Sequence, residues 1–136
     1  MPFFSAYAAS KTAVVRFGET LAENLREAGI DVNCVVPGAL NTQMLEEVLA
    51  AGPEKVGPVL LSGLGAPEGI GWRVDRSCRC LCVYFTTSDS NGITGKFISG
   101  VWDPWTNFEV HRKDLQDTDV YTLRRIVPHE RGLHSG

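Results

Sequence analysis

Hydrophobic and polar side chains alternate with a helical period near the start of the chain. Between residues 5 and 28, apolar side chains recur at steps of three, four and seven residues, and charged side chains fill the positions between them. This spacing predicts one amphipathic helix over residues 5–28, and Gly29 follows as its stop signal. The apolar positions of the predicted stripe are Tyr7, Val14, Phe17, Leu21 and Leu25.

A buried strand is predicted next. Residues 30–36 are mostly β-branched or apolar, and Pro37-Gly38 ends the run abruptly. Such a run, bounded by turn residues, is typical of a strand buried on both faces. A long helix followed by a tight turn and a buried strand is half of a βαβ unit, so the pattern predicts an α/β protein with a parallel sheet.

The middle of the chain carries weaker patterns. Residues 42–51 predict a short helix that begins at a cap on Asn41 or Thr42 and ends at Gly52-Pro53. Residues 54–67 are rich in glycine and proline, which predicts a loop.

Two further elements are expected before the chain becomes polar. A second helix is predicted between residues 66 and 86, and a turn at Asn91-Gly92 precedes a short final strand over residues 93–99. From residue 102 onward the sequence is polar and charged, with one short element expected at residues 120–127.

Composition narrows the class of protein. The chain has 136 residues, of which 43% are hydrophobic and 21% charged, so one compact globular domain is expected. A net charge of −3 does not indicate a nucleic-acid or anionic-membrane surface. Because the chain has no apolar run of about 20 residues and no secretory signal, we expect no membrane partner and a cytoplasmic location.

The cysteines raise the question of a metal site. Cys34 stands alone, whereas Cys78, Cys80 and Cys82 form a C-x-C-x-C run. Zinc sites usually combine two such ligand groups, and the three histidines, all in the C-terminal tail, do not form a second one. We therefore expect no metal, and reduced thiols in or beside the core.

The residues that carry a chemical signal are Tyr7 and Lys11. A spacing of four residues on a helix places the phenol and the ammonium on one face, within reach of each other. A phenol is a poor proton donor or acceptor at neutral pH, and a fixed positive charge nearby favours the phenolate. The pair therefore has a route to proton transfer. The alternative reading is a core aromatic and a solvated helix charge.

Three features in a fixed order favour the catalytic reading. The run from Tyr7 to Lys11 is followed by the strand of residues 30–36 with its Pro37-Gly38 turn, and later by Ser88-Asp89 and residues 93–96. Over roughly residues 3–100 this order resembles the short-chain dehydrogenase/reductase family, with its active-site helix, sixth strand, turn over the nicotinamide and last strand. Residues 69–82 depart from the family's usual helix of alanines, leucines and acidic residues.

The resemblance implies roles for individual residues. Tyr7 would exchange the proton as hydride moves between substrate and nicotinamide, and Lys11 would also bind the nicotinamide ribose. The backbone of Leu40 would meet the carboxamide and the hydroxyl of Thr42 would contact the cofactor, which is NAD or NADP. Pro37-Gly38 would lie over the nicotinamide, or alternatively only stop the strand; the carboxyl end of a strand is where α/β sheets place ligands.

The same resemblance indicates what lies outside this chain. In that family the glycine-rich phosphate loop and the catalytic serine precede the tyrosine, and only six residues precede Tyr7. Gly65, Gly69 and Gly71 neither follow a predicted strand nor open a convincing helix. We therefore expect the C-terminal half of a Rossmann-like, doubly wound parallel sheet, with one strand edge unpaired.

These expectations define a function and its alternatives. The chain would be a truncated NAD(P)-dependent oxidoreductase, inactive alone, whose complete form reduces a carbonyl or oxidises an alcohol of a small molecule. The small, apolar residues 44–64 suggest a modestly hydrophobic substrate. Two alternatives stay open: a non-catalytic partner that pairs its long helix with a full-length relative, as family members commonly do in homo-oligomers, or a chain with no independent function.

A boundary is predicted near the end of the last strand. Residues 1–101 would form the C-terminal part of the NAD(P)-binding domain, and residues 102–136 a polar extension. Trp102 and Trp105 would serve as its apolar anchors over the substrate entrance or a subunit contact; the alternative is a loose polar terminus.

Overall fold

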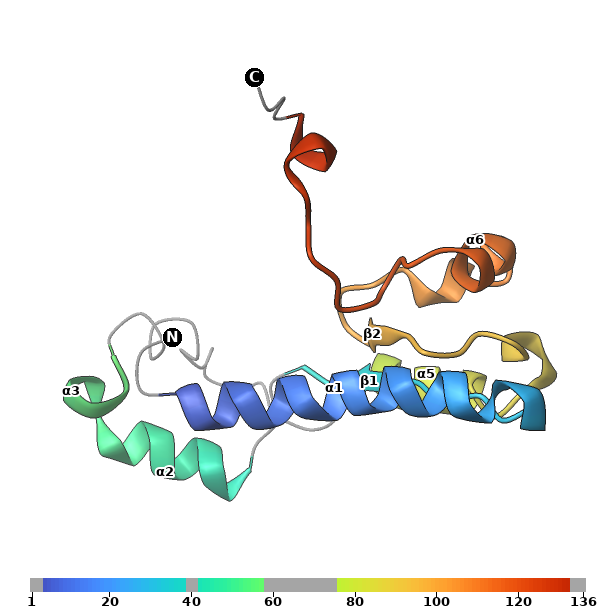
Figure 1. The fold of residues 1–136 in the computed structure, drawn as a ribbon. Helices are drawn as coiled ribbons and strands as arrows, with labels where there is room; N and C mark the ends of the chain where they lie inside the picture. The colour runs from blue at the N-terminus through green and yellow to red at the C-terminus, as the bar shows by residue number, and fades with distance from the viewer. Residues whose placement is uncertain (1–3, 39–41, 58–75, 133–136) are drawn as a thin grey trace.

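A computed structural model describes residues 4–38, 42–57 and 76–132 of the chain. Figure 1 shows a long helix beside two short strands, with smaller helices around them. In chain order the elements are α1 (Ser5–Leu25), η1 (Arg26–Ala28), β1 (Cys34–Val36), α2 (Gln43–Ala51), α3 (Pro53–Val56), α5 (Arg76–Tyr84), η2 (Ser88–Ser90), β2 (Phe97–Ser99), η3 (Trp105–Asn107), α6 (Arg112–Asp117) and η4 (Pro128–Arg131).

The helix predicted over residues 5–28 is confirmed as α1 with the 3-10 turn η1. It ends at Gly29, whose φ of +69° is the left-handed conformation that favours glycine. The predicted apolar stripe is wrong in part, because Val14 and Phe17 are 59% and 66% exposed. The buried line of α1 is instead formed by small side chains and a valine: Val15, Gly18 and Ala22.

The two strands are parallel, as predicted, but shorter. β1 pairs with β2 in the register Cys34 to Phe97, Val35 to Ile98 and Val36 to Ser99. Residues 30–33 were expected to belong to the first strand and residues 93–96 to the last. Side chains join these segments beside one backbone bond, from the Gly95 N–H to the Val32 carbonyl at 2.7 Å. The Val32 N–H donates to Thr94 Oγ1 at 2.9 Å, and the Asn33 amide group donates to the Ile93 carbonyl at 2.6 Å.

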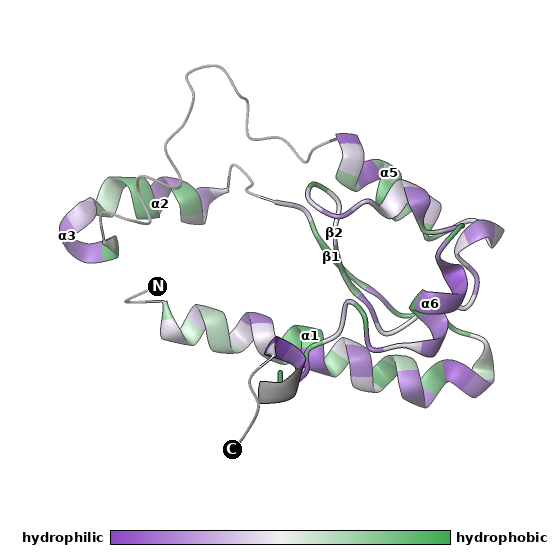
Figure 2. Ribbon diagram, turned by 90° about the horizontal axis from the view of Figure 1, so that it is seen from above, coloured by the Kyte–Doolittle hydropathy of each residue, from purple (hydrophilic) through white to green (hydrophobic). Residues whose placement is uncertain are grey.

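Helices lie on both sides of the strand pair, so the described architecture is α/β. In Figure 2 the strands run between α1 and α5. On the α5 side the chains approach so closely that a Cβ on Gly100 would stand 2.5 Å from the Cα of Cys78. The core combines α5, β2 and the residues after it; its buried members are Leu81, Ile93, Ile98, Phe108 and Leu115.

The middle of the chain forms α2 and α3. The helix predicted over residues 42–51 is confirmed, with Thr42 as its cap. Helix α3 lies where a loop was predicted from residue 54, because Pro53 is well suited to a first helical turn; the rest of that predicted loop lies outside the described residues. The predicted second helix is confirmed in α5, and its expected first turns fall outside the described residues.

The residues after β2 take part in the core. Phe108 and Leu115 are buried there, and α6 was not expected from the sequence. The element expected at residues 120–127 is wrong, since these residues are neither helix nor strand. Trp105 is half-buried, with its indole N–H 3.2 Å from the Gly100 carbonyl, whereas Trp102 is largely exposed. The division of the chain at residue 101 stays a prediction.

The described residues contain no helix that is long and apolar enough to cross a membrane. Cys34, Cys80 and Cys82 are free thiols; Cys78 is buried and Cys34 half-buried, whereas Cys80 and Cys82 are exposed rather than in the core. Within the described ranges no three histidine, cysteine or acidic side chains are grouped as a metal ion would require.

Candidate active site

Tyr7 and Lys11 lie together on the first two turns of α1. The Lys11 ammonium stands 5.4 Å from the centre of the Tyr7 ring, so the helical spacing brings the two groups together as expected. The side chain of Tyr7 is 39% exposed and that of Lys11 is exposed. Tyr7 is thus not a core aromatic in the described structure.

The ammonium faces the ring of Tyr7 rather than its hydroxyl. A cation over an aromatic face is attracted by the ring's quadrupole. At exposed sites this interaction contributes about 0.5–1 kcal/mol. Among the described residues, neither the Tyr7 hydroxyl nor the Lys11 ammonium has a hydrogen-bond partner. Both polar groups therefore keep their hydrogen-bonding capacity for a group outside the described residues.

Phe4 and Ser10 hold the backbone and ring of Tyr7. The Phe4 ring meets the Tyr7 ring edge-on at 6.2 Å between centroids. The Ser10 hydroxyl donates to the Tyr7 carbonyl at 2.7 Å. Ser10 therefore uses its hydroxyl within the helix and does not present it beside the phenol.

The Pro37-Gly38 turn lies at the same end of the unit as Tyr7 and Lys11. The Cys34 sulfur is 4.0 Å from the Val14 carbonyl, which fixes β1 at that level of α1. From there β1 runs back toward the start of α1, and three to four extended residues cover roughly 10–13 Å. Seven helical residues, from Val14 back to Tyr7, cover about 10 Å. With these ideal rises, the Pro37-Gly38 turn is expected toward the start of α1, the half of the helix that carries Tyr7 and Lys11.

The turn has a conformation that favours glycine. Gly38 has a φ of +79°, and a Cβ at this position would stand 3.1 Å from Val101 Cγ2. The predicted contact residue Leu40 lies outside the described residues. Thr42, the other predicted contact, accepts a hydrogen bond from the Leu45 N–H at 3.3 Å as the cap of α2, so its hydroxyl proton is still available to a ligand.

The sequence reading missed the turn after β2, which supports Gly38 through Val101. Ser99 and Asp103 hold this turn: the Ser99 N–H donates to Asp103 Oδ2 at 2.6 Å, and the Val101 N–H donates to Ser99 Oγ at 3.2 Å. A Ser and an Asp four residues apart after a strand are typical turn residues. That pattern predicts the turn, but its contact with Gly38 comes only from the parallel register of β1 and β2.

Two comparisons with known proteins bear on this site. The sequence model of the short chain dehydrogenase family matches residues 1–52, the segment that holds Tyr7, Lys11, Pro37 and Gly38. A cyclohexanol dehydrogenase of Rhodococcus sp. (strain TK6) is 30% identical over 97 residues, which are 70% of this chain and 33% of that protein. No solved structure matches the chain.

Two further relatives agree. A dehydrogenase/reductase SDR family member 6 of Danio rerio is 31% identical over 103 residues, covering 71% of this chain and 40% of that protein. An NADPH-dependent aldehyde reductase-like protein of Arabidopsis thaliana, described as chloroplastic, is 38% identical over 85 residues, which are 52% of this chain and 32% of that protein. The chain belongs to the short-chain dehydrogenase/reductase family. It spans about a third of the length of these relatives.

Proposed function

We propose that this chain supplies the proton-transfer pair and the nicotinamide-side turn of an NAD(P)-dependent oxidoreductase that interconverts an alcohol and a carbonyl. The observation that carries the proposal is the contact of the Lys11 ammonium with the ring of Tyr7 on the exposed first two turns of α1. Family membership supports the same chemistry. The substrate would be a small, modestly hydrophobic molecule, and a cytoplasmic location belongs to the proposal on sequence grounds alone.

In this proposal the hydroxyl of Tyr7 carries the proton. During carbonyl reduction Tyr7 Oη donates its proton to the oxygen of the substrate, and during alcohol oxidation the phenolate accepts that proton. The Lys11 ammonium stabilises the phenolate by its charge and holds the phenol ring through the contact seen at 5.4 Å.

The residues present fit the nicotinamide end of the cofactor. The free ammonium of Lys11 would bind the ribose hydroxyls, the Pro37-Gly38 turn would lie against the ring, and Leu40 and Thr42 would meet the carboxamide side. Gly38 allows the left-handed backbone of this turn, where a Cβ would stand 3.1 Å from Val101 Cγ2. The bound cofactor would supply the hydride. No described helix follows a glycine-rich turn of the kind that holds a pyrophosphate.

The proposal therefore requires a further dinucleotide-binding segment besides these residues. The two parallel strands and their helices would be the C-terminal half of a doubly wound sheet, and the 136-residue chain alone would bind no NAD(P)H at tens of micromolar. Titration calorimetry with NADH and NADPH tests this part. Stoichiometric binding by the chain alone would contradict it.

The catalytic roles are tested after the upstream half of a family member has been fused before the first residue. We expect Tyr7→Phe to lower turnover by about 10²–10⁴-fold with cofactor affinity nearly unchanged, because only the proton-carrying hydroxyl is lost. Lys11→Ala should weaken both turnover and cofactor affinity. Tyr84→Phe and Lys113→Ala are matched controls, since these residues lie on α5 and α6, and both variants should leave turnover unchanged. A Tyr7→Phe enzyme with near-normal turnover would refute the mechanism.

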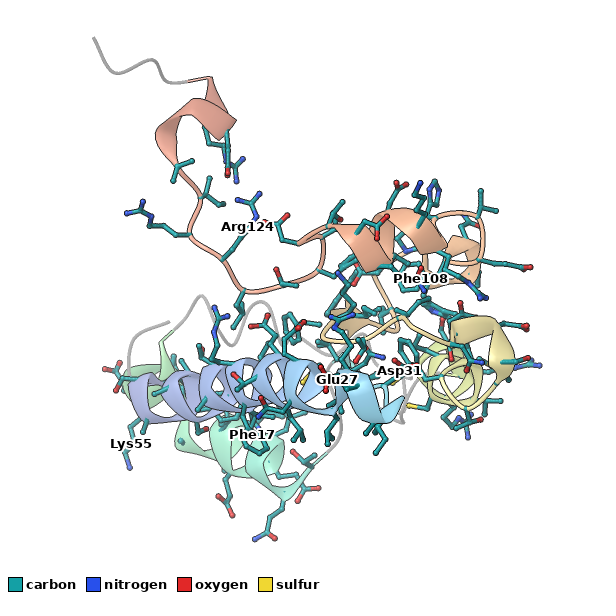
Figure 3. All side chains as sticks on the ribbon, turned by 45° about the vertical axis from the view of Figure 1, so that its right-hand side comes forward. Phe17, Glu27, Asp31, Lys55, Phe108 and Arg124 are labelled. Atoms are coloured by element: carbon teal, nitrogen blue, oxygen red, sulfur yellow. The ribbon has the colours of Figure 1, made fainter. Side chains whose placement is uncertain are left out.

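A second candidate function is pairing with a full-length relative or a second copy through α1. The observation that favours it is the exposure of Val14 and Phe17 on this helix; in Figure 3 Phe17 lies on the side of α1 away from the C-terminal segment. Light scattering of the wild type and Phe17→Ser tests it, with Val83→Ser as an equally exposed control on α5. A wild-type monomer at 100 micromolar would exclude self-pairing.

A further inference from the structure

The residues after α6 cross the outer edge of β2 and then the middle of α1. The Phe97 N–H points away from β1 and donates to the Tyr121 carbonyl at 2.8 Å. The next outward-pointing N–H of β2, that of Ser99, donates to Asp103 Oδ2 at 2.6 Å. The C-terminal part of the chain thus occupies both outward donors of this strand.

Lys96 holds the first part of the crossing segment. Its side chain is buried, with the residue only 4% exposed, and its ammonium donates to the carbonyls of Thr118 at 2.8 Å and Val120 at 3.1 Å. Burial lowers the pKa of Lys96, while the charge of Asp119 opposes this shift. A buried ammonium is tolerated only where its protons are satisfied, so Lys96 and residues 118–120 require each other.

An ion pair on α1 holds the other end of the segment. Arg16 and Glu19 lie 2.7 Å apart, and the Glu19 side chain is only 12% exposed. The Leu123 N–H donates to Glu19 Oε1 at 2.6 Å, and an Arg16 guanidinium nitrogen donates to the Leu123 carbonyl. One oppositely charged pair therefore binds both backbone polar groups of a single residue, Leu123, which lies more than 100 positions away in the sequence.

All of these contacts are made to the backbone of the crossing segment. Between them lies Tyr121, whose φ of +60° is a left-handed conformation that residues with a Cβ rarely adopt. Its ring packs against Phe108 at 5.6 Å between centroids. Such a conformation persists only where the surroundings impose it, which indicates that the dock, rather than local preference, shapes this segment.

We propose that Arg16, Glu19 and Lys96 form a backbone-binding dock that keeps residues 118–123 over the outer edge of β2, and that this cover prevents β2 from pairing with a second copy of this chain. An uncovered edge presents unpaired N–H groups and is a template for strand addition. Phe97 is itself partly exposed, so an uncovered edge would also offer an apolar side chain to the second copy.

The test compares two ion pairs on the same helix. Arg16→Ala/Glu19→Ala removes the dock, and Glu23→Ala/Arg26→Ala removes a pair of the same spacing that does not touch the segment. We expect amide exchange at Tyr121 to Leu123 and tryptic cleavage after Arg124 to accelerate about tenfold in the first variant only. Light scattering at 10–100 micromolar should show association beyond that of the wild type in the same variant.

The conservative variant Glu19→Gln separates the dock from simple loss of charge. Its amide oxygen still accepts from the Leu123 N–H. Amide exchange at Leu123 and the molecular mass measured by light scattering should therefore stay near the wild-type values. If the circular-dichroism spectrum of the Arg16→Ala/Glu19→Ala variant shows that it is unfolded, Glu19→Ala alone is measured, because it removes one acceptor and leaves Arg16 in place. Unchanged exchange at Leu123, or an opened segment without added association, would overturn the proposal.

Discussion

Gly18 of α1 lies against the sulfur of Cys34 at the start of β1: a Cβ on Gly18 would stand 2.7 Å from Cys34 Sγ. Contact this close sets the distance between the long helix and the sheet. It explains why small residues, Gly18 and Ala22, occupy the face of α1 that is buried.

The Gly18–Cys34 contact predicts that Gly18→Ala destabilises the wild-type fold but stabilises the fold of a Cys34→Ala variant. Gly18→Ala in the wild type should destabilise the fold, because an overlap that costs about 1–3 kcal/mol outweighs a gain in helix propensity of about 1 kcal/mol. In a Cys34→Ala background the overlap is absent, so the same substitution should stabilise by about 1 kcal/mol. Urea unfolding of the four proteins measures the coupling; additive effects would mean that the sulfur moves aside without cost.

Tyr84 predicts a loss of stability at alkaline pH. Its hydroxyl donates to the Asp89 carbonyl at 3.1 Å, and burial raises its pKa above the ordinary value of about 10. The unfolded chain therefore loses this proton at a lower pH than the folded chain. The stabilising contribution is complete below pH 10 and is lost as the pH rises through the folded-state pKa.

The measurement is urea unfolding of wild type and Tyr84→Phe between pH 9 and 11.5. Tyr84→Phe should be less stable at pH 9, because the hydrogen bond is gone, and the difference should shrink as the pH rises. Urea unfolding of Tyr121→Phe over the same pH range provides the comparison, because burial also raises the pKa of Tyr121 above its ordinary value. A wild type whose difference from Tyr84→Phe is constant over this range would contradict the assignment.

Thr42 predicts a local effect on α2. Thr42→Ala removes the acceptor for the Leu45 N–H and should cost the helix about 1 kcal/mol, whereas Thr42→Ser keeps the acceptor and should cost little. Amide exchange within residues 43–51 reports the effect directly. Thr20→Ala is the control, because the Thr20 hydroxyl donates to the Arg16 carbonyl in the interior of α1 and caps no helix. Equal exchange in the Ala and Ser variants would show that the cap contributes nothing.

Local chemistry in the sequence accounts for the elements and for the candidate pair. The helical period, Gly29 and the Pro37-Gly38 turn predicted α1, the first strand and their order, because each depends on neighbouring residues only. The spacing of Tyr7 and Lys11 sufficed to bring the two side chains together, since a helix places residues four apart on one face.

Contacts between distant segments were decided only by the tertiary structure. The apolar period of α1 selected Val14 and Phe17 as inward, but the close approach of Cys34 selected Gly18, so small size outweighed hydrophobicity on that face. Likewise, the polar residues after Trp102 gave no sign that Lys96, Arg16 and Glu19 would bind the backbone of residues 118–123. Backbone groups are the same at every position, so a dock that binds them leaves no pattern in the sequence of the segment it holds.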